Sequence, residues 1–234
     1  MTAPPAHVTA ALLGTGAWAG VLARAAQGST RVRFATCWSR KAERVRAFAA
    51  EHGLAVADDP DAIWNDDAID AVVIALPNAH HRAYAEAAAR HGKHVFIEKP
   101  IADTLPDGLA IARLQDAHGV HVAVGHCARL LAGNRLMRAA IRRGDLGRVT
   151  LIETSFSNAR AARLTPDDWR WYSASAPGGP LSQIAIHQFD TLRALGGDIR
   201  SVAAASARLA PTGAEVEDQW IATVEFASGA LGSV

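Results

Sequence analysis

The sequence has little of several features that would assign it to a specialised protein class. Its 234 residues include two cysteines, Cys37 and Cys127, which lie far apart and form no C-x-x-C motif. Such sparse cysteines exclude a disulfide scaffold and fit a reducing, cytoplasmic compartment. No uninterrupted apolar run reaches the roughly 18 residues that a membrane span needs, and the N-terminus lacks the basic start of a signal peptide. We therefore expect no membrane segment.

Neither sign of charge is in excess. The 24 lysines and arginines balance 23 aspartates and glutamates, and no basic run stands out. This balance argues against nucleic acid or a membrane surface as a partner. His118 and His121 are spaced as a pair, but no third ligand follows nearby. A protein metal site needs more ligands than this pair, so we expect no metal.

What the sequence does contain is a regular alternation over residues 1–125. Short β-branched runs alternate with alanine-rich helical stretches, which is typical of βαβ units in a doubly wound parallel sheet. The expected strands are Val8–Leu13, Val32–Trp38, Ala71–Leu76, His94–Ile97 and His121–Val124. The expected helices are Ala17–Ala26, Lys41–His52, His80–His91 and Leu105–His118. Thr104 precedes the last helix with Asp107 three residues on, a pattern close to a capping box.

The rhythm changes after Gly125, which predicts a second, α+β domain over residues 126–234. A helix at Asn134–Arg143 precedes a strand at Val149–Phe156 and an irregular loop at 157–180. A further helix at Leu181–Leu195 leads into a mainly antiparallel sheet. Its expected strands are Ser201–Leu209, Trp220–Phe226 and, after a hairpin turn at Ser228-Gly229, Ala230–Val234.

A glycine-rich turn follows the first strand. It reads Gly14-x-Gly16-x-x-Ala19, a match to the dinucleotide-binding pattern G-x-G-x-x-G/A. The first glycine allows the tight turn, the second lets the backbone approach a pyrophosphate, and the small third residue permits close helix packing. We expect Gly14, Gly16, Ala17 and Trp18 to form the phosphate turn, with Trp18 packed under it. The alternative is a plain structural turn.

The end of the second strand bears on the choice of cofactor. Folds that prefer NAD usually carry a carboxylate there for the ribose hydroxyls. This chain has Ser39-Arg40-Lys41 instead. Ser39 can bond a 2′-phosphate and Arg40 can pair with it through two N–H groups. The sequence thus favours NADP over NAD, although Arg40 and Lys41 could simply be solvated.

The tripeptide Glu98-Lys99-Pro100 ends the buried strand His94–Ile97. Open α/β sheets bind ligands outside the carboxyl ends of their strands, and Pro100 would stop the strand there. A lysine held in such a cleft can transfer a proton, whereas a merely solvated lysine would not. We expect the first role for Lys99.

Together these motifs resemble the glucose–fructose oxidoreductase and inositol dehydrogenase (Gfo/Idh/MocA) family of NAD(P)-dependent oxidoreductases. The resemblance covers nearly the whole chain. Besides the glycine turn, it includes Pro77-Asn78-x-x-His81, Glu98-Lys99-Pro100, Val124-Gly125-His126-x-x-Arg129, Gly178-Gly179 and Gln183-x-Ala185-x-His187-x-x-Asp190.

The resemblance implies roles for these residues. Lys99 would lie by the nicotinamide and substrate, and His187 would serve as acid/base or orient the reacting hydroxyl. Further cofactor contacts would come from Pro77, Asn78, His81 and Glu98. Substrate contacts would come from His126, Arg129, Trp169 and Gln183, although Trp169 could instead cap the sheet. The implied reaction moves a hydride between nicotinamide and a carbinol carbon of a sugar, polyol or cyclic (dihydro)diol, and we expect a homo-oligomer formed through the C-terminal sheet.

Two departures from the family pattern favour an alternative, a catalytically impaired or regulatory nucleotide-binding homologue. The family usually has Asp-x-Gly-x-His, where this chain has Gln183 and Ala185. Residues four apart share a helix face, so Gln183 and His187 should point the same way. Family members also usually continue past Ser228-Gly229, so we expect a truncated C-terminal domain with an unpaired sheet edge.

Overall fold

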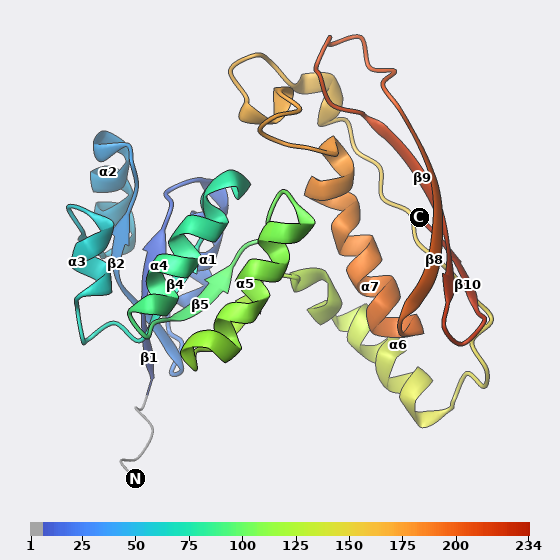
Figure 1. Ribbon diagram of the computed structural model, residues 1–234, viewed down its shortest axis with the longest axis horizontal. Helices are drawn as coiled ribbons and strands as arrows, with labels where there is room; N and C mark the ends of the chain where they lie inside the picture. Colours follow the sequence, from blue (N-terminus) through green and yellow to red (C-terminus); the bar gives the residue numbers. More distant parts are fainter. Residues whose placement is uncertain (1–6) are drawn as a thin grey trace. The chain divides into compact units, whose positions relative to one another are not determined.

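The structure is a computed structural model that describes residues 7–234, and it divides into two compact units, one ending at Gly125 and one beginning at His126 (Figure 1). Each unit has its own sheet. In this described part of the chain, no helix is long and apolar enough to cross a membrane.

The first unit is built on a six-stranded parallel sheet with the order β3-β2-β1-β4-β5-β6. This is the Rossmann order, in which the first strand lies at the centre and the chain winds outward on both sides. The strands are β1 (Val8–Leu13), β2 (Val32–Trp38), β3 (Ala55–Val56), β4 (Ala71–Ile74), β5 (His94–Ile97) and β6 (Val122–Val124). The predicted doubly wound parallel sheet is confirmed.

Helices cover both faces of this sheet. Alternate residues of β1 face opposite ways, so Ala10 and Leu12 pack on one side and Ala11 and Leu13 on the other. The first pair packs with side chains of α1 (Ala17–Ala26) and α2 (Ala42–His52). The second pair packs with side chains of three other helices. These are α3 (Pro60–Trp64), α4 (His81–Arg90) and α5 (Leu105–His118).

Two short elements of the first unit were not predicted. Strand β3 has only two residues, too few to show an alternating pattern. Helix α3 has five residues, but its start carried a usable signal. Asp59 accepts a hydrogen bond from the Ala62 N–H at 2.8 Å, and Pro60 occupies the first turn. The predicted ends of β4, β6, α2 and α4 are each off by one or two residues.

The second unit packs one helix against a four-stranded sheet of order β7-β10-β9-β8. The strands are β7 (Leu151–Glu153), β8 (Ile199–Ala207), β9 (Gln219–Phe226) and β10 (Leu231–Ser233). Strand β10 runs parallel to β7, and the other pairs are antiparallel, so the mainly antiparallel sheet is confirmed. Within residues 126–234 the edges are β7 and β8, and β10 lies between two partners.

Helix α7 (Ile186–Gly196) supplies Leu192 to a core with Val224, Phe226 and Ala230. The helix ends at Gly196, which lies against the sheet. A Cβ atom on Gly196 would lie 2.5 Å from Cε1 of Phe226, so glycine is needed there. Helix α6 (Ala132–Arg143) starts two residues before the prediction, and Gly144, at φ +78°, ends it.

The segment from β7 to α7 differs from its prediction in three ways. Strand β7 has three residues rather than the eight from Val149 to Phe156. The loop at 157–180 contains two 3₁₀ turns, η3 (Ala161–Arg163) and η4 (Trp169–Trp171). The predicted single helix begins as a π-helical turn, η5 (Leu181–Ala185), and becomes α-helical only at Ile186.

The two cysteines lie in contrasting environments. Cys37 is fully buried in β2, and this burial raises the pKa of its thiol to about 11. Cys127 is exposed, at the start of the 3₁₀ turn η2 (Cys127–Leu130).

The cap of α5 gives a direct stability test. Thr104 Oγ1 accepts a hydrogen bond from Asp107 N at 3.2 Å and donates one to Asp107 Oδ2 at 2.8 Å, as the capping pattern predicted. Thr104→Ala should therefore lower the free energy of unfolding by about 0.5–2 kcal/mol, measured by urea denaturation. Thr104→Ser keeps the hydroxyl and should keep most of that stability. Equal losses in the two variants would show that the methyl group, and not the cap, matters.

Candidate active site

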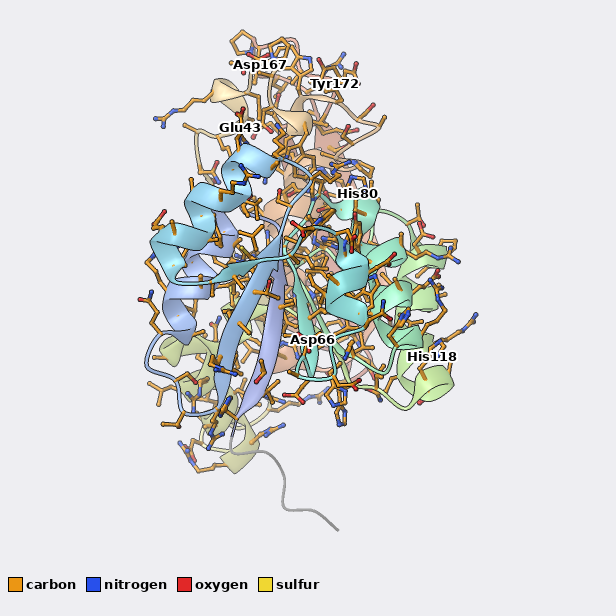
Figure 2. The ribbon with its side chains drawn as sticks, turned by 90° about the vertical axis from the view of Figure 1, so that its left-hand side faces the viewer. Glu43, Asp66, His80, His118, Asp167 and Tyr172 are labelled. Carbon is orange, nitrogen blue, oxygen red and sulfur yellow. The ribbon has the colours of Figure 1, made fainter. Side chains whose placement is uncertain are left out.

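The parallel strands of the first unit all finish at one edge of the sheet, which gathers the predicted cofactor residues. Gly14 follows β1, Ser39 follows β2, Pro77 and Asn78 follow β4, and Glu98 follows β5. Figure 2 shows Glu43 and His80 at the end of the sheet where the strands finish, and Asp66 and His118 toward the opposite end. This edge is where open α/β sheets bind ligands.

The glycine turn has the geometry that its pattern predicts. Gly14 has φ +110°, and a Cβ there would lie 2.4 Å from the carbonyl oxygen of Ala75, so no other residue fits. At Gly16, by contrast, a Cβ would meet nothing within 4 Å. No side chain caps the start of α1, so its N–H groups are available to an anion. Ala19 is fully buried in the core beside β1, as the motif requires.

Two other residues of the turn are exposed. Ala17 begins α1, and Trp18 follows with 45% of its surface accessible. The prediction that Trp18 packs under the turn is therefore wrong, because the first turn of α1 directs this side chain to the surface while Ala19 takes the buried position.

The end of β2 carries no carboxylate but does carry cations. Ser39 Oγ accepts a hydrogen bond from Lys41 N at 3.5 Å. Arg40 is exposed, and its charge reaches the segment after β4, since the pKa of His80 is lowered first by burial and then by Arg40. The guanidinium of Arg40 thus lies near the segment that follows β4.

His81 ties two strand ends together. Its side chain is fully buried, Nε2 lies 3.0 Å from the Leu76 carbonyl oxygen, and Nδ1 lies 3.0 Å from that of Pro100. A neutral imidazole carries one N–H, so His81 donates to one of these two carbonyl oxygens, and its ring lies between the end of β4 and the turn after β5. Having no exposed surface, His81 fits a positioning role better than the direct cofactor contact that we expected.

Glu98 is also buried, and it fixes the backbone of the next residue. Its Oε2 accepts a hydrogen bond from Lys99 N at 3.2 Å. Its Oε1 occupies the space beside Gly125, where a Cβ would come within 2.7 Å. Lys99 is half-buried and precedes a cis peptide bond to Pro100.

In the second unit, the predicted residues after Gly125 meet those of α7. Arg129 Nε donates to Asp190 Oδ2 at 2.7 Å, and its Nη2 donates to Oδ1 of the same carboxylate. Asp190 is buried, and its hydrogen bond raises the pKa of Arg129. His126 Nδ1 lies 3.8 Å from Asp190 Oδ1, and the rings of His126 and His187 stand perpendicular, 6.3 Å apart. The sequence indicated these residues but not the ion pair that joins them.

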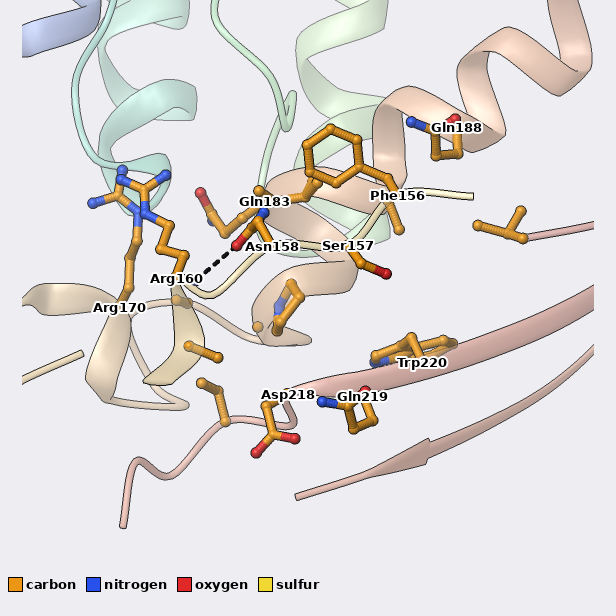
Figure 3. Close-up of a pocket in the computed structure, with 18 of the residues that line it drawn as sticks. Phe156, Ser157, Asn158, Arg160, Arg170, Gln183, Gln188, Asp218, Gln219 and Trp220 are labelled. Carbon is orange, nitrogen blue, oxygen red and sulfur yellow. Dashed lines mark hydrogen bonds between the residues drawn. The ribbon is translucent and has the colours of Figure 1, made fainter. Parts of the chain in front are cut away.

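The π-helical turn changes the prediction for Gln183. A π-helix bonds residue i to i+5, so the four-residue repeat on which we placed Gln183 and His187 on one face does not apply across residues 181–185. Gln183 lines a cavity of about 460 Å³ in this unit (Figure 3). Trp169 does not line it, but Arg170, stacked 4.2 Å above the centre of the Trp169 ring, does.

Residues 7–234 bring together no group of three or more histidine, cysteine, aspartate or glutamate side chains that could hold a metal ion.

Comparison with known proteins assigns both units to protein families. Residues 8–126 match the oxidoreductase family with an NAD-binding Rossmann fold, and residues 134–234 match the Gfo/Idh/MocA C-terminal domain. The chain belongs to the Gfo/Idh/MocA family. The family resemblance of its motifs is thus confirmed.

Individual relatives are sugar enzymes. The chain is 35% identical over 197 residues to 1,5-anhydro-D-fructose reductase of Ensifer adhaerens, covering 82% of this chain and 58% of the relative. It is 31% identical over 221 residues to levoglucosan dehydrogenase of Pseudarthrobacter phenanthrenivorans, covering 82% of this chain and 55% of the relative. The chain thus spans little more than half the length of these relatives.

Solved structures agree in fold. A Desulfitobacterium hafniense protein described as a candidate NADPH-dependent oxidoreductase superposes with a TM-score of 0.92 at 32% identity, covering 97% of this chain and 65% of that one. Levoglucosan dehydrogenase in complex with NADH and levoglucosan superposes with a TM-score of 0.88 at 28% identity, covering 97% and 66%. The two descriptions name different cofactors, so they leave the choice between NADP and NAD open.

The open space at Gly16 gives a test of cofactor binding. The glycine turn fits an NAD(P) pyrophosphate, and Gly16→Val would put a branched side chain where that group must approach. We expect NAD(P) affinity, measured by calorimetry, to fall by at least about tenfold, or 1.4 kcal/mol, with the fold kept. Gly14→Val is the contrasting variant, since its Cβ collides with Ala75 and should destabilise the first unit. Unchanged affinity in Gly16→Val would rule out this turn as the phosphate site.

Proposed function

We propose that this chain is an NAD(P)-dependent oxidoreductase acting on a sugar, polyol or cyclic diol. The observation that carries the proposal is the edge of the Rossmann sheet, where two strands end in a glycine turn with open space at Gly16 and in half-buried Lys99, whose backbone N–H donates to Glu98. The sugar-active relatives support the substrate class. When bound, the nicotinamide would supply the hydride chemistry, and the protein would supply placement and proton transfer.

Different residues of the chain would bind the cofactor, transfer the proton and position the substrate. Gly14 allows the tight turn and Gly16 lets the backbone approach the pyrophosphate, while Ser39 and Arg40 bind the 2′-phosphate on the ribose of NADP. Lys99 and His187 hold and transfer the proton of the reacting hydroxyl. Asp190 orients His126 and Arg129 so that they present fixed polar groups to the substrate. Pro77, Asn78 and His81 shape the strand ends around the cofactor.

A regulatory homologue without turnover is the second candidate, and Gln183 in place of the family aspartate favours it. Gln183 can form hydrogen bonds but cannot carry a charge. Turnover with a panel of sugars, polyols and cyclic diols, tested with NADP and with NAD, separates the two candidates. Cofactor binding without oxidation or reduction of any member of the panel would favour the regulatory role.

We also propose that the second unit assembles copies of the chain through its sheet. Side chains in β9 alternate between the core beneath α7 and the opposite face, where Ile221 is 63% exposed. Leu151 and Leu231 pair across β7 and β10 and are also exposed. An apolar face of this kind is typical of an interface.

Cofactor preference is tested at Arg40. Arg40→Ala removes a charge-assisted contact with the 2′-phosphate, worth about 1.5–3 kcal/mol, so NADP affinity should fall about 10- to 150-fold. NAD has no 2′-phosphate and should bind nearly unchanged. Arg44→Ala is the matched control, because it removes the same charge from α2 at an exposed position one turn later. Tighter binding of NAD than of NADP by the unaltered chain would contradict the preference.

Proton transfer is tested at Lys99 and His187 with a substrate found in the panel. General acid–base help is worth about 100- to 10,000-fold in rate, so Lys99→Ala and His187→Ala should each reduce kcat by that order. Groups that act as a unit lose far less in the double variant than the sum of the single losses. We expect the two single variants and the double variant to fall to similar residual rates, with cofactor affinity little changed.

Lys99→Arg distinguishes proton transfer from a purely positioning cation. Arginine keeps the positive charge but does not give up its proton, so this variant should be as slow as Lys99→Ala. If Lys99→Ala keeps nearly the full kcat from about pH 6 to 9, the lysine is not the proton carrier.

A further inference from the structure

The cavity of the second unit has the size and wall of a small-molecule site. Its volume of about 460 Å³ lies in the range of ligand pockets, roughly 300–1,000 Å³. Its wall comes from the loop after β7, the π-helical turn η5 and the start of β9 (Figure 3). Gln183 and Gln188 line it from the helical segment that also carries His187.

Two arginines in the wall lie close together. Figure 3 shows the guanidinium groups of Arg160 and Arg170 side by side, above the 3₁₀ turns of the loop. Burial and the positive charge of Arg160 lower the pKa of Arg170 from its ordinary value. Two like charges at one place are unfavourable unless an anion offsets them.

The acidic side chains nearby leave this charge only partly compensated. Asp168 Oδ1 lies 3.4 Å from Arg170 Nη1, but no carboxylate in residues 7–234 pairs with Arg160. Asp218, the one acid of the cavity wall among those residues, keeps its negative charge but forms no ion pair with either arginine; it accepts hydrogen bonds from the N–H groups of Leu209 and Ala210 at 2.9 and 2.6 Å. With Asp168 as the one carboxylate in contact with them, the two arginines retain about one net positive charge between them.

The wall also holds hydrogen-bond donors that lack acceptors. The Nε atom of Arg170 and the indole Nε1 of Trp220 are buried, and neither has a hydrogen-bond partner within the described residues. Buried donors are normally satisfied, and each one left unsatisfied costs about 1–3 kcal/mol. Phe156 and the ring of Trp220 supply apolar faces in the same wall. Such a wall fits a ligand that carries one negative charge, hydroxyl groups that accept hydrogen bonds, and an apolar face that can pack on an aromatic ring.

We infer that this cavity binds the carboxylate end of a sugar acid, such as a uronate, with Arg160 and Arg170 holding the carboxylate. A planar guanidinium matches the two oxygens of a carboxylate, and one net positive charge matches a single negative one. Gln183 and Gln188 face the hydroxyls of the sugar ring. This inference rests on the proposed function, and it narrows the substrate class of that function to acidic sugars.

The test is calorimetry of the full chain with D-glucuronate, D-glucose and D-glucose 6-phosphate as probes, without cofactor. Glucuronate should bind at least about tenfold more tightly than glucose, since a hydrogen bond to a charged group is worth about 1.5–3 kcal/mol. Arg160→Gln and Arg170→Gln should each weaken glucuronate binding about 10- to 150-fold. Arg160 is exposed, so its variant should fold even if Arg170→Gln does not.

Arg163→Gln is the matched control, because Arg163 is an exposed arginine of the same loop outside the cavity wall, and its loss should leave glucuronate binding unchanged. Equal affinities for glucuronate and glucose would overturn the inference. So would a loss of glucuronate affinity in Arg163→Gln as large as that in Arg160→Gln and Arg170→Gln. Tighter binding of the sugar phosphate would overturn the assignment to a carboxylate. Glucuronate binding that persists while no sugar is oxidised or reduced would instead count against the proposed function alone.

Discussion

Parallel strand pairing is the constraint on which the candidate site of the first unit depends. Because all six strands run the same way, segments far apart in the sequence finish at one edge. The pairing of β1 with β4 also brings Gly14 against the carbonyl of Ala75, so the shape of the turn is set by the neighbouring strand as well as by its own residues. Glu98 and Gly125 repeat this arrangement at the ends of β5 and β6, where a missing side chain makes room for a buried carboxylate.

In the second unit, one ion pair joins η2 to α7. The carboxylate of Asp190 is buried, and its two oxygens are taken by Arg129. Removing one partner of such a pair leaves the other without compensation, so loss of Arg129 would leave a buried carboxylate on α7. His187 lies on α7 and His126 directly precedes η2, so the ion pair joins the segments that carry the two histidines of the candidate site.

Regular elements could be predicted because their patterns are local. In the first unit, β1, β2, β5, α1 and α5 have the predicted bounds, since each shows a clear period and a clear stop. Short elements such as β3 could not be predicted, because two residues are too few to show an alternating pattern. The π-helical turn could not be predicted, because its sequence has the same apolar spacing as an α-helix and tertiary packing decides between the two.

In the candidate site, too, local features could be predicted and contacts between distant residues could not. The geometry of the glycine turn could be predicted from the sequence, because the backbone conformation there restricts which residue types can occur. The contacts of His81 and the pairing of Arg129 with Asp190 join residues distant in sequence, so a single chain offers no spacing that reveals them. Arg160 and Arg170 were overlooked because an arginine in an irregular loop looks like an ordinary solvated residue until a cavity is seen beside it.

The contrast between the two thiols has a practical consequence. The thiolate is the reactive form, so a buried thiol whose pKa is about 11 resists alkylation at neutral pH, while Cys127 is exposed. A maleimide dye or spin label would thus attach at one position in the unaltered chain, between His126 and Arg129. Such a probe would report on η2 spectroscopically without any engineered cysteine.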